Sequence, residues 1–214
     1  MKKLSALFGL SITAAVALPQ FASASIINEV ESNDTIATAQ NIDAFFSTGA
    51  NSDIANATTI PWVSILSANA NSNTTSYDYY SFSATAGSTG VFDIDYGLNS
   101  GGSFDAELVL FDSTGLTIAQ NDDSSTSNGA GGSVHGFDSF LTYTFGSSGL
   151  YTIGVCEFSC GGTTGGMTGN MVDSADTYTL QVSIEDHRTS EVPVPSTALL
   201  FGLGLLGLAR KLKK

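Results

Sequence analysis

Residues 90–96 read Gly-Val-Phe-Asp-Ile-Asp-Tyr, a stretch in which apolar and polar side chains alternate. One face of an extended chain would carry Phe92, Ile94 and Tyr96, and the opposite face would carry Asp93 and Asp95. Side chains two residues apart lie on the same side of a β-strand. The alternation therefore predicts a half-buried strand rather than a helix.

Residues 177–184 repeat this pattern, with Tyr178, Leu180, Val182 and Ile184 on one face. Further apolar runs are separated by segments rich in Gly, Ser, Asn and Asp, at 78–84, 104–111, 137–145 and 150–155. Many short strands joined by turn-forming residues are typical of an all-β protein. We expect an antiparallel, jelly-roll-like β-sandwich of about eight strands.

The predicted organisation has five parts. Residues 1–24 form a signal peptide, and residues 25–76 form an acidic and polar segment with an insertion that packs on the sandwich. Residues 77–186 form the sandwich core. Residues 187–195 are a linker with a Pro-x-Pro motif, in which His187 is expected to be solvated, and residues 196–214 form a transmembrane sorting helix with a basic tail.

Charge is distributed very unevenly along the chain. All seven basic residues lie outside residues 4–187, whereas all 20 Asp and Glu residues lie between 25 and 192. Nucleic-acid binding is excluded, because neutralising phosphates needs Lys and Arg. Ion pairs within the domain are nearly excluded too, so the carboxylates must be hydrated or balanced by metal ions.

The N-terminus has the features of a secretory signal. Met1-Lys2-Lys3 is followed by an apolar run from Leu4 to Leu18 and by Ala22-Ser23-Ala24, an A-x-A cleavage site. This order predicts export by the Sec machinery and cleavage by signal peptidase after Ala24.

The C-terminus has the layout of a stop-transfer segment. Pro193 and Pro195 precede the apolar residues 198–209, and Arg210 opens a terminal basic cluster. The basic end should stay cytoplasmic, which leaves residues 25–191 outside the inner membrane and the chain transiently anchored in it. A buried core helix is the alternative.

This C-terminal layout resembles the PEP-CTERM sorting signal of Gram-negative bacteria, over residues 192–214. The resemblance implies processing by an exosortase, a membrane-embedded protease that releases the protein or attaches it at the cell surface. The usual central Glu of Pro-Glu-Pro is replaced by Val194 here.

A second resemblance spans roughly residues 28–184, with an insertion between Gln40 and Tyr77. It is carried by ordered short motifs: Glu29-x-Glu31-x-Asn33-Asp34-Thr35, Asp78-Tyr79-Tyr80-Ser81-Phe82, Asp105-x-x-Leu108-x-Leu110-Phe111-Asp112, Asn121-Asp122-Asp123-Ser124 and Ser148-Gly149-Leu150-Tyr151. These motifs are similar to the bacterial pre-peptidase C-terminal domain. That family implies a non-catalytic sandwich, which in collagenases is a calcium-stabilised collagen-binding module.

The opening motif is also a candidate calcium site on chemical grounds. Ca²⁺ takes six to eight oxygen ligands, and four oxygen-bearing side chains lie within six residues of one another. The resemblance adds a fifth ligand from the following strand, which gives the set Glu29, Glu31, Asn33, Asp34 and Asp78. The alternative is an acidic, disordered tail. A second acidic group would form another site if its loops converge: Asp105, Asp112, Asp122, Asp123 and Asp138.

The two cysteines, Cys156 and Cys160, are separated by three residues in a chain that we expect to be exported. A local disulfide is therefore favoured over a zinc site, for which only His135 and His187 could complete the ligands. It would close the base of a long loop at 159–176.

No arrangement of residues signals catalysis, so we do not expect an enzyme. The sequence predicts a non-catalytic cell-surface or extracellular-matrix protein of a Gram-negative bacterium, associated with exopolysaccharide or biofilm. A secreted module that binds carbohydrate or protein is the alternative, with Trp62 and the tyrosines as possible contact residues.

Overall fold

The fold was analysed in a computed structural model that describes residues 25–67 and 75–187. The predicted signal peptide, with Ala22 and Ala24, lies outside the described residues. So do the sorting helix and its flanking residues Pro193, Pro195 and Arg210. No helix within the described residues is long and apolar enough to cross a membrane.

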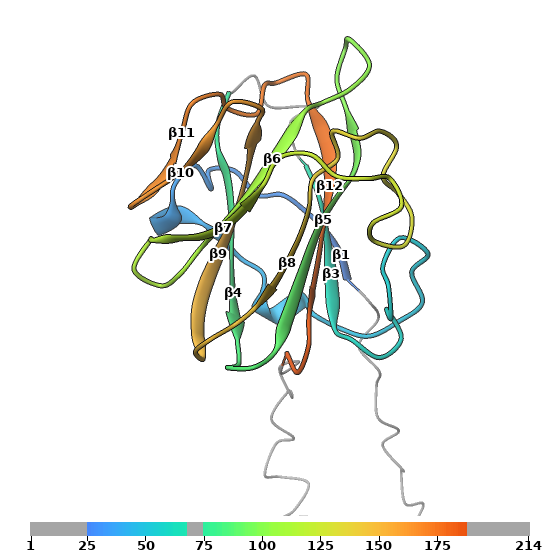
Figure 1. The fold of residues 1–214 in the computed structure, drawn as a ribbon, viewed down its shortest axis with the longest axis vertical. Coiled ribbons are helices and arrows are strands. Elements are labelled where there is room, and N and C mark those ends of the chain that lie inside the picture. Colours follow the sequence, from blue (N-terminus) through green and yellow to red (C-terminus); the bar gives the residue numbers. More distant parts are fainter. Residues whose placement is uncertain (1–24, 68–74, 188–214) are drawn as a thin grey trace, which may run out of the picture.

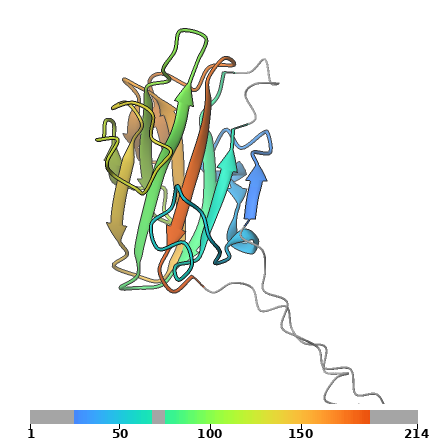
Figure 2. The ribbon, with the colours of Figure 1, turned by 90° about the vertical axis from the view of Figure 1, so that its right-hand side faces the viewer.

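Two five-stranded sheets pack face to face, as Figures 1 and 2 show. The first sheet has the order β1 (Ser25–Asn28), β3 (Trp62–Leu66), β12 (Thr177–Ile184), β5 (Thr89–Leu98) and β8 (Phe140–Thr144). The second has the order β2 (Gln40–Asn41), β4 (Asp78–Ala84), β9 (Gly149–Glu157), β6 (Ala106–Phe111) and β7 (Thr117–Asn121). The predicted all-β sandwich is confirmed.

The remaining elements are short. β10 (Gly161–Thr163) and β11 (Gly166–Thr168) form a separate hairpin, and the 3-10 helices η1 (Ile36–Thr38) and η2 (Asp43–Phe45) flank β2. The hairpin occupies the segment predicted as a long loop after Cys156. Thr35 caps η1 by accepting a hydrogen bond from Thr38 N.

The sheets are mixed rather than purely antiparallel. β1 pairs with β3 in parallel, and β2 pairs with β4 in parallel. Parallel neighbours need a long crossover connection, and here the chain crosses between the sheets: β2 lies between β1 and β3 in the sequence but belongs to the other sheet. Residues 25–66 thus supply three strands, so the sandwich extends N-terminally beyond residue 77.

The core between the sheets is rich in aromatic rings. Phe145 and Tyr151 have ring centroids 4.5 Å apart, and Phe82 and Phe92 have centroids 5.4 Å apart. Such tilted pairs bury large apolar area and fix the spacing of the two sheets. Trp62 is also buried, and its indole N–H lies 3.2 Å from Gly49 O and 3.1 Å from Ala57 O.

The alternation that predicted β5 holds only in part. Phe92 and Ile94 are fully buried in the core, but Tyr96 is 44% exposed and has a φ of +53°. The pairing of β12 with β5 shifts register at this point, between Thr177 and Thr179, so the expected inward placement of Tyr96 was wrong. Asp93 and Asp95 are buried on the outer face of the sheet, because other segments cover it.

The environment of His187 also differs from what the sequence predicted. This residue was expected to be solvated, yet only 8% of it is exposed. Its ring stacks on Phe46 with centroids 3.9 Å apart, and its Nε2 lies 3.0 Å from Asp43 Oδ1. The domain therefore extends to His187, where the C-terminal end of the sandwich packs against the segment after β2.

Candidate functional site: an acidic cluster at the start of strand β4

The predicted calcium ligands come from two places in the sequence that the fold brings together. Glu29 follows β1, where its backbone N–H donates to Leu66 O at 2.8 Å. Asn33 lies next to the start of β4, because Tyr79 N donates to Asn33 O at 3.1 Å. The Asn33 side-chain amide then donates to Glu29 Oε1 at 3.1 Å, which links the two residues directly.

Asp78 completes the buried part of this cluster. It is fully buried, and its carboxylate accepts hydrogen bonds from Ser76 Oγ at 3.2 Å and from the Tyr178 hydroxyl at 2.7 Å. The Tyr80 hydroxyl lies 2.8 Å from that of Tyr178. Burial raises the pKa of Asp78 well above its usual value, and the nearby negative charge of Glu29 raises it further.

The more exposed predicted ligands lie at the edge of the same cluster. Glu31 also raises the pKa of the Asp78 carboxyl, so its charge is close. Glu31 and Asp34 line one pocket together with Ser76, Tyr77 and Met171. Solvent thus reaches the cluster from the side of residues 31–34.

The donor set fits a calcium ion. Glu29, Asn33 and Asp78 are buried and offer carboxylate or amide oxygens, the ligands that Ca²⁺ prefers. Asn33 Oδ1 is buried and has no hydrogen-bond partner, so one oxygen here lacks the donor that a buried acceptor normally has. No Lys or Arg between residues 4 and 187 could neutralise these charges.

Sequence reasoning missed the two tyrosines that position Asp78. Alternation placed Tyr178 on one face of its strand, whereas Tyr80 appeared only within a family motif, and the tyrosines were named as possible contact residues. Both side chains are buried in the core. Their hydroxyls nevertheless end beside the Asp78 carboxylate. A buried tyrosine usually needs a hydrogen-bond partner, and this was the only signal in the sequence that pointed to such a role.

Of the second acidic group, three members converge. Carboxylate oxygens of Asp105, Asp122 and Asp123 lie within 4.8 Å of one another. Burial raises the pKa of the neighbouring Glu107 to about 7, and the charges of Asp122 and Asp105 add to this effect.

The other two members of that group have separate structural roles. Asp112 Oδ1 accepts from Thr114 N at 2.8 Å and from Leu116 N at 3.1 Å, so it closes its own turn. The Asp138 carboxylate accepts from Gly97 N at 3.1 Å and from Val134 N at 2.6 Å.

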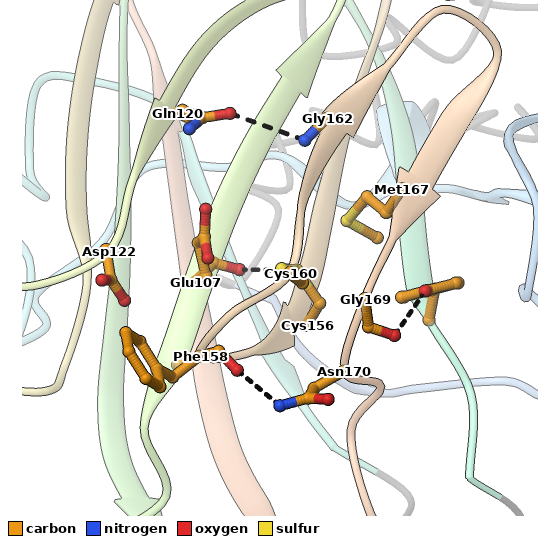
Figure 3. The surroundings of a disulfide bond; sticks show 12 residues. Glu107, Gln120, Asp122, Cys156, Phe158, Cys160, Gly162, Met167, Gly169 and Asn170 are labelled. Atoms are coloured by element: carbon orange, nitrogen blue, oxygen red, sulfur yellow. Dashed lines mark hydrogen bonds between the residues drawn. A yellow bond between two sulfur atoms is a disulfide. The ribbon is translucent and has the colours of Figure 1, made fainter.

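The predicted disulfide is confirmed. Cys156 and Cys160 are bonded, with Cα atoms 6.3 Å apart, and join the end of β9 to the start of β10 (Figure 3). Cys156 is buried against Tyr79, Val109 and Met167. Below the bond in this view, the side-chain amide of Asn170 donates to Phe158 O at 2.8 Å, which holds the far side of the loop.

Neither histidine is arranged for nucleophilic catalysis. His135 Nε2 lies against Gly97 O, and His135 Nδ1 is 3.7 Å from Asp138 Oδ1. His187 pairs with Asp43. The ring partners are thus a carbonyl and carboxylates rather than a serine hydroxyl, and no catalytic triad is formed by them.

Two protein families match separate parts of this chain. The family described as "Bacterial pre-peptidase C-terminal domain" matches residues 76–156, and the "PEP-CTERM protein-sorting motif" matches residues 191–214. The chain thus carries a PEP-CTERM sorting motif and a domain that resembles the pre-peptidase C-terminal domain. The sorting motif indicates a protein that is exported and sorted by an exosortase, and neither matched family is catalytic.

Similar solved structures include two periplasmic inhibitors of g-type lysozyme. PliG from Aeromonas hydrophila is 14% identical, with a TM-score of 0.34 over 75% of this chain and 96% of that one. A PliG mutant from Escherichia coli is 15% identical, with a TM-score of 0.30 over 76% of this chain and 100% of that one. No curated protein matches this chain.

Proposed function

We propose that this protein is a non-catalytic surface or matrix protein, in which a calcium-stabilised sandwich is held outside the cell in association with exopolysaccharide. Export and exosortase sorting follow from the PEP-CTERM motif. The large excess of carboxylates between residues 25 and 192 supports a role among hydrated, cation-rich polymers.

The main support for a calcium site is Asn33 Oδ1, a buried oxygen without a hydrogen-bond partner that lies beside Glu29 and Asp78. An ion at this place would be held by Glu29, Glu31, Asn33, Asp34 and Asp78. When bound, it would supply positive charge and oxygen coordination to a cluster that has neither Lys nor Arg. It would thereby tie residues 29–34 to the start of β4 and stabilise the N-terminal strands.

Thermal unfolding of the full-length chain in nonionic detergent, with Ca²⁺ or with EDTA, tests this site. A site filled at about 100 times its dissociation constant should stabilise the fold by roughly 2.7 kcal/mol. We expect the Glu31→Ala/Asp34→Ala variant to lose most of this gain. Asp186→Asn is the control, since Asp186 is exposed and lies outside the cluster.

An unchanged response to Ca²⁺ in the Glu31→Ala/Asp34→Ala variant would remove the calcium assignment. If neither the parent nor the variant responds, residues 29–34 form only a hydrogen-bonded acidic segment beside Asp78 that binds no ion.

Cell fractionation tests the location. We expect the full-length chain, in a Gram-negative host with a matching exosortase, to accumulate with the extracellular polysaccharide, and a chain lacking residues 192–214 to be lost from that fraction. Equal accumulation of both would contradict sorting as the cause. A saturable sugar or protein ligand would instead favour the function of a binding module.

A further inference from the structure

A further acidic cluster, formed by Asp93 and Asp95, lies on the outer face of the first sheet. It differs from both the Glu29–Asp78 cluster and the group that contains Asp105, Asp122 and Asp123. Asp93 and Asp95 are two residues apart on β5, so both point away from the core in which Phe92 and Ile94 are packed. An outward carboxylate on a sheet face is normally hydrated, yet Asp93 is only 2% exposed and Asp95 is fully buried.

Two segments that are distant in sequence cover these carboxylates. One is the connection between β7 and β8, whose residues Gly129 and Gly132 lie directly on them. A Cβ built on Gly129 would collide with Asp93 Oδ2, and one built on Gly132 would collide with both carboxylate oxygens of Asp95. Tyr96 N also donates to Gly132 O at 3.1 Å, which fastens this loop to β5.

The second covering segment is the part of the N-terminal insertion that contains Asp53. The Tyr96 hydroxyl donates to Asp53 Oδ2 at 3.0 Å, and Asp53 Oδ1 lies 3.2 Å from the position of a Cβ on Gly131. A third carboxylate is thus brought to the edge of the same cluster. Asp53, Asp93 and Gly129 line one pocket of about 120 Å³, several times the roughly 30 Å³ that a water molecule occupies.

Hydrogen bonding leaves these carboxylates unsatisfied. Both oxygens of Asp93 and Oδ1 of Asp95 are buried without a hydrogen-bond partner. Only Asp95 Oδ2 has one, the Gln181 amide at 2.9 Å, while Gln181 Oε1 in turn accepts from Ser64 Oγ. Asp138, also buried, accepts hydrogen bonds from three backbone N–H groups and illustrates how a purely structural aspartate is satisfied.

The electrostatic surroundings of Asp93 and Asp95 also disfavour two unneutralised carboxylates. Burial raises the pKa of Asp93 to about 8 and that of Asp95 to about 7, and the neighbouring carboxylates Asp53 and Asp138 raise both further. The chain offers no Lys or Arg between residues 4 and 187 to compensate them. Two buried carboxylates that share a single hydrogen-bond donor and have no cationic side chain must therefore take up either protons or a cation.

We propose that Asp93 and Asp95 bind a divalent cation of the calcium class beneath the Gly129–Gly132 loop, with Asp53 at the mouth of the site. The available ligands are all oxygens, which favours Ca²⁺ over zinc or copper. Water entering the pocket and backbone carbonyls complete the coordination, as Ca²⁺ commonly accepts. The ion adds a further link between β5 and these two segments, which hydrogen bonds of Tyr96 already join to the strand.

The test is the number of Ca²⁺ ions bound per full-length chain in nonionic detergent, measured by equilibrium dialysis with elemental analysis. We expect Asp93→Asn/Asp95→Asn to bind one ion fewer than the parent. Asp112→Asn, in an exposed turn, is the control and keeps the parental number. Asp78→Asn removes the Glu29–Asp78 site instead, so the failure of one site is distinguishable from the failure of the other.

A second readout does not depend on counting ions. In EDTA at pH 8, the Asp93→Asn/Asp95→Asn variant should unfold at a higher temperature than the parent, because two repelling buried charges are gone. In excess Ca²⁺ the difference in unfolding temperature between the variant and the parent should become smaller or change sign. Asp93→Asn alone, which leaves the Asp95–Gln181 hydrogen bond intact, serves if the double variant does not fold.

An unchanged ion count together with an unchanged Ca²⁺-induced shift would overturn the proposal. The aspartates would then hold protons only. Repeating the unfolding measurement with Mg²⁺ in place of Ca²⁺ tests the selectivity of the site. We expect a smaller shift with Mg²⁺, because it gives up its water reluctantly and demands a strict octahedral site.

Discussion

His187 Nε2 lies 3.0 Å from Asp43 Oδ1, and this contact joins the last described residue of the chain to the turn that follows β2. Asp43 also accepts from Ser83 N at 2.7 Å and from Ser83 Oγ at 2.8 Å. One carboxylate therefore connects three segments: the N-terminal part, β4 and the residues after β12. Figure 1 shows the described chain ending just after β12, at the lower end of the sandwich.

This arrangement predicts a loss of stability for Asp43→Asn at neutral pH. Burial raises the pKa of Asp43, but the hydrogen bonds from His187 and Ser83 outweigh it and lower the pKa to about 2. Hydrogen bonds to a charged group contribute about 1.5–3 kcal/mol each when buried, and Asp43 is partly exposed. We expect a loss of about 1–2 kcal/mol in thermal or denaturant unfolding.

The effect of Asp43→Asn on stability should depend on pH. Because the pKa of Asp43 is lower in the folded state than in the unfolded state, its contribution is present above about pH 4 and is lost as the pH falls through 2. The difference between the parent and Asp43→Asn should vanish near pH 2. A constant difference across this range would mean that the lost stability comes from packing rather than from charge.

Gly132→Ala should destabilise the fold more than Gly87→Ala does. The two glycines have nearly equal φ values, +88° and +86°, so both substitutions carry the same backbone cost of about 1 kcal/mol. A Cβ on Gly87 meets open space, whereas one on Gly132 meets the Asp95 carboxylate. Overpacking adds about 1–3 kcal/mol, measurable by chemical unfolding. Equal losses would show that the loop moves aside freely.

Tyr178→Phe should cost about 2 kcal/mol, because it removes the hydroxyl that donates to the buried Asp78 carboxylate at 2.7 Å. Tyr151→Phe is a matched comparison, since its hydroxyl donates to a neutral carbonyl, Ser147 O, also at 2.7 Å. We expect about 1 kcal/mol there. The prediction fails if urea unfolding gives the two variants the same loss.

Replacement of both cysteines by alanine should leave the fold intact. The Cys156–Cys160 bond closes a very short loop, so the chain-entropy effect is small, about 2 kcal/mol or less. We expect a decrease of a few degrees in the unfolding midpoint, with the parent in reducing agent behaving like the double variant. Complete loss of cooperative unfolding would contradict a purely local role.

Sequence patterns predicted the fold well where the chain follows simple alternation. Phe92 and Ile94, and likewise Leu180 and Val182, are buried in the core as expected. The pattern failed at Tyr96, where a positive φ and a register shift end the alternation. Local deviations of this kind depend on the pairing with β12, which alternation within β5 cannot reveal.

The proposed calcium ligands show a similar division between what the sequence and what the fold reveals. Glu29, Glu31, Asn33 and Asp34 form a motif that is visible in the sequence, and a family resemblance connected them to Asp78. The hydroxyls of Tyr80 and Tyr178, which meet at Asp78, come from strands of two different sheets. Their convergence is a property of the packed sandwich.

The sequence by itself determined the all-β class, the sorting motif, the disulfide and the acidic character of the domain, because each depends on local pattern or composition. Only the tertiary structure decided that Asp93 and Asp95 are buried and that His187 belongs to the domain. The physical reason is that burial depends on what covers a residue. Here the covering residues are distant in the chain, from about 34 to more than 140 positions away. They are Asp53, Gly129 and Gly132 for the two aspartates, and Phe46 and Asp43 for His187.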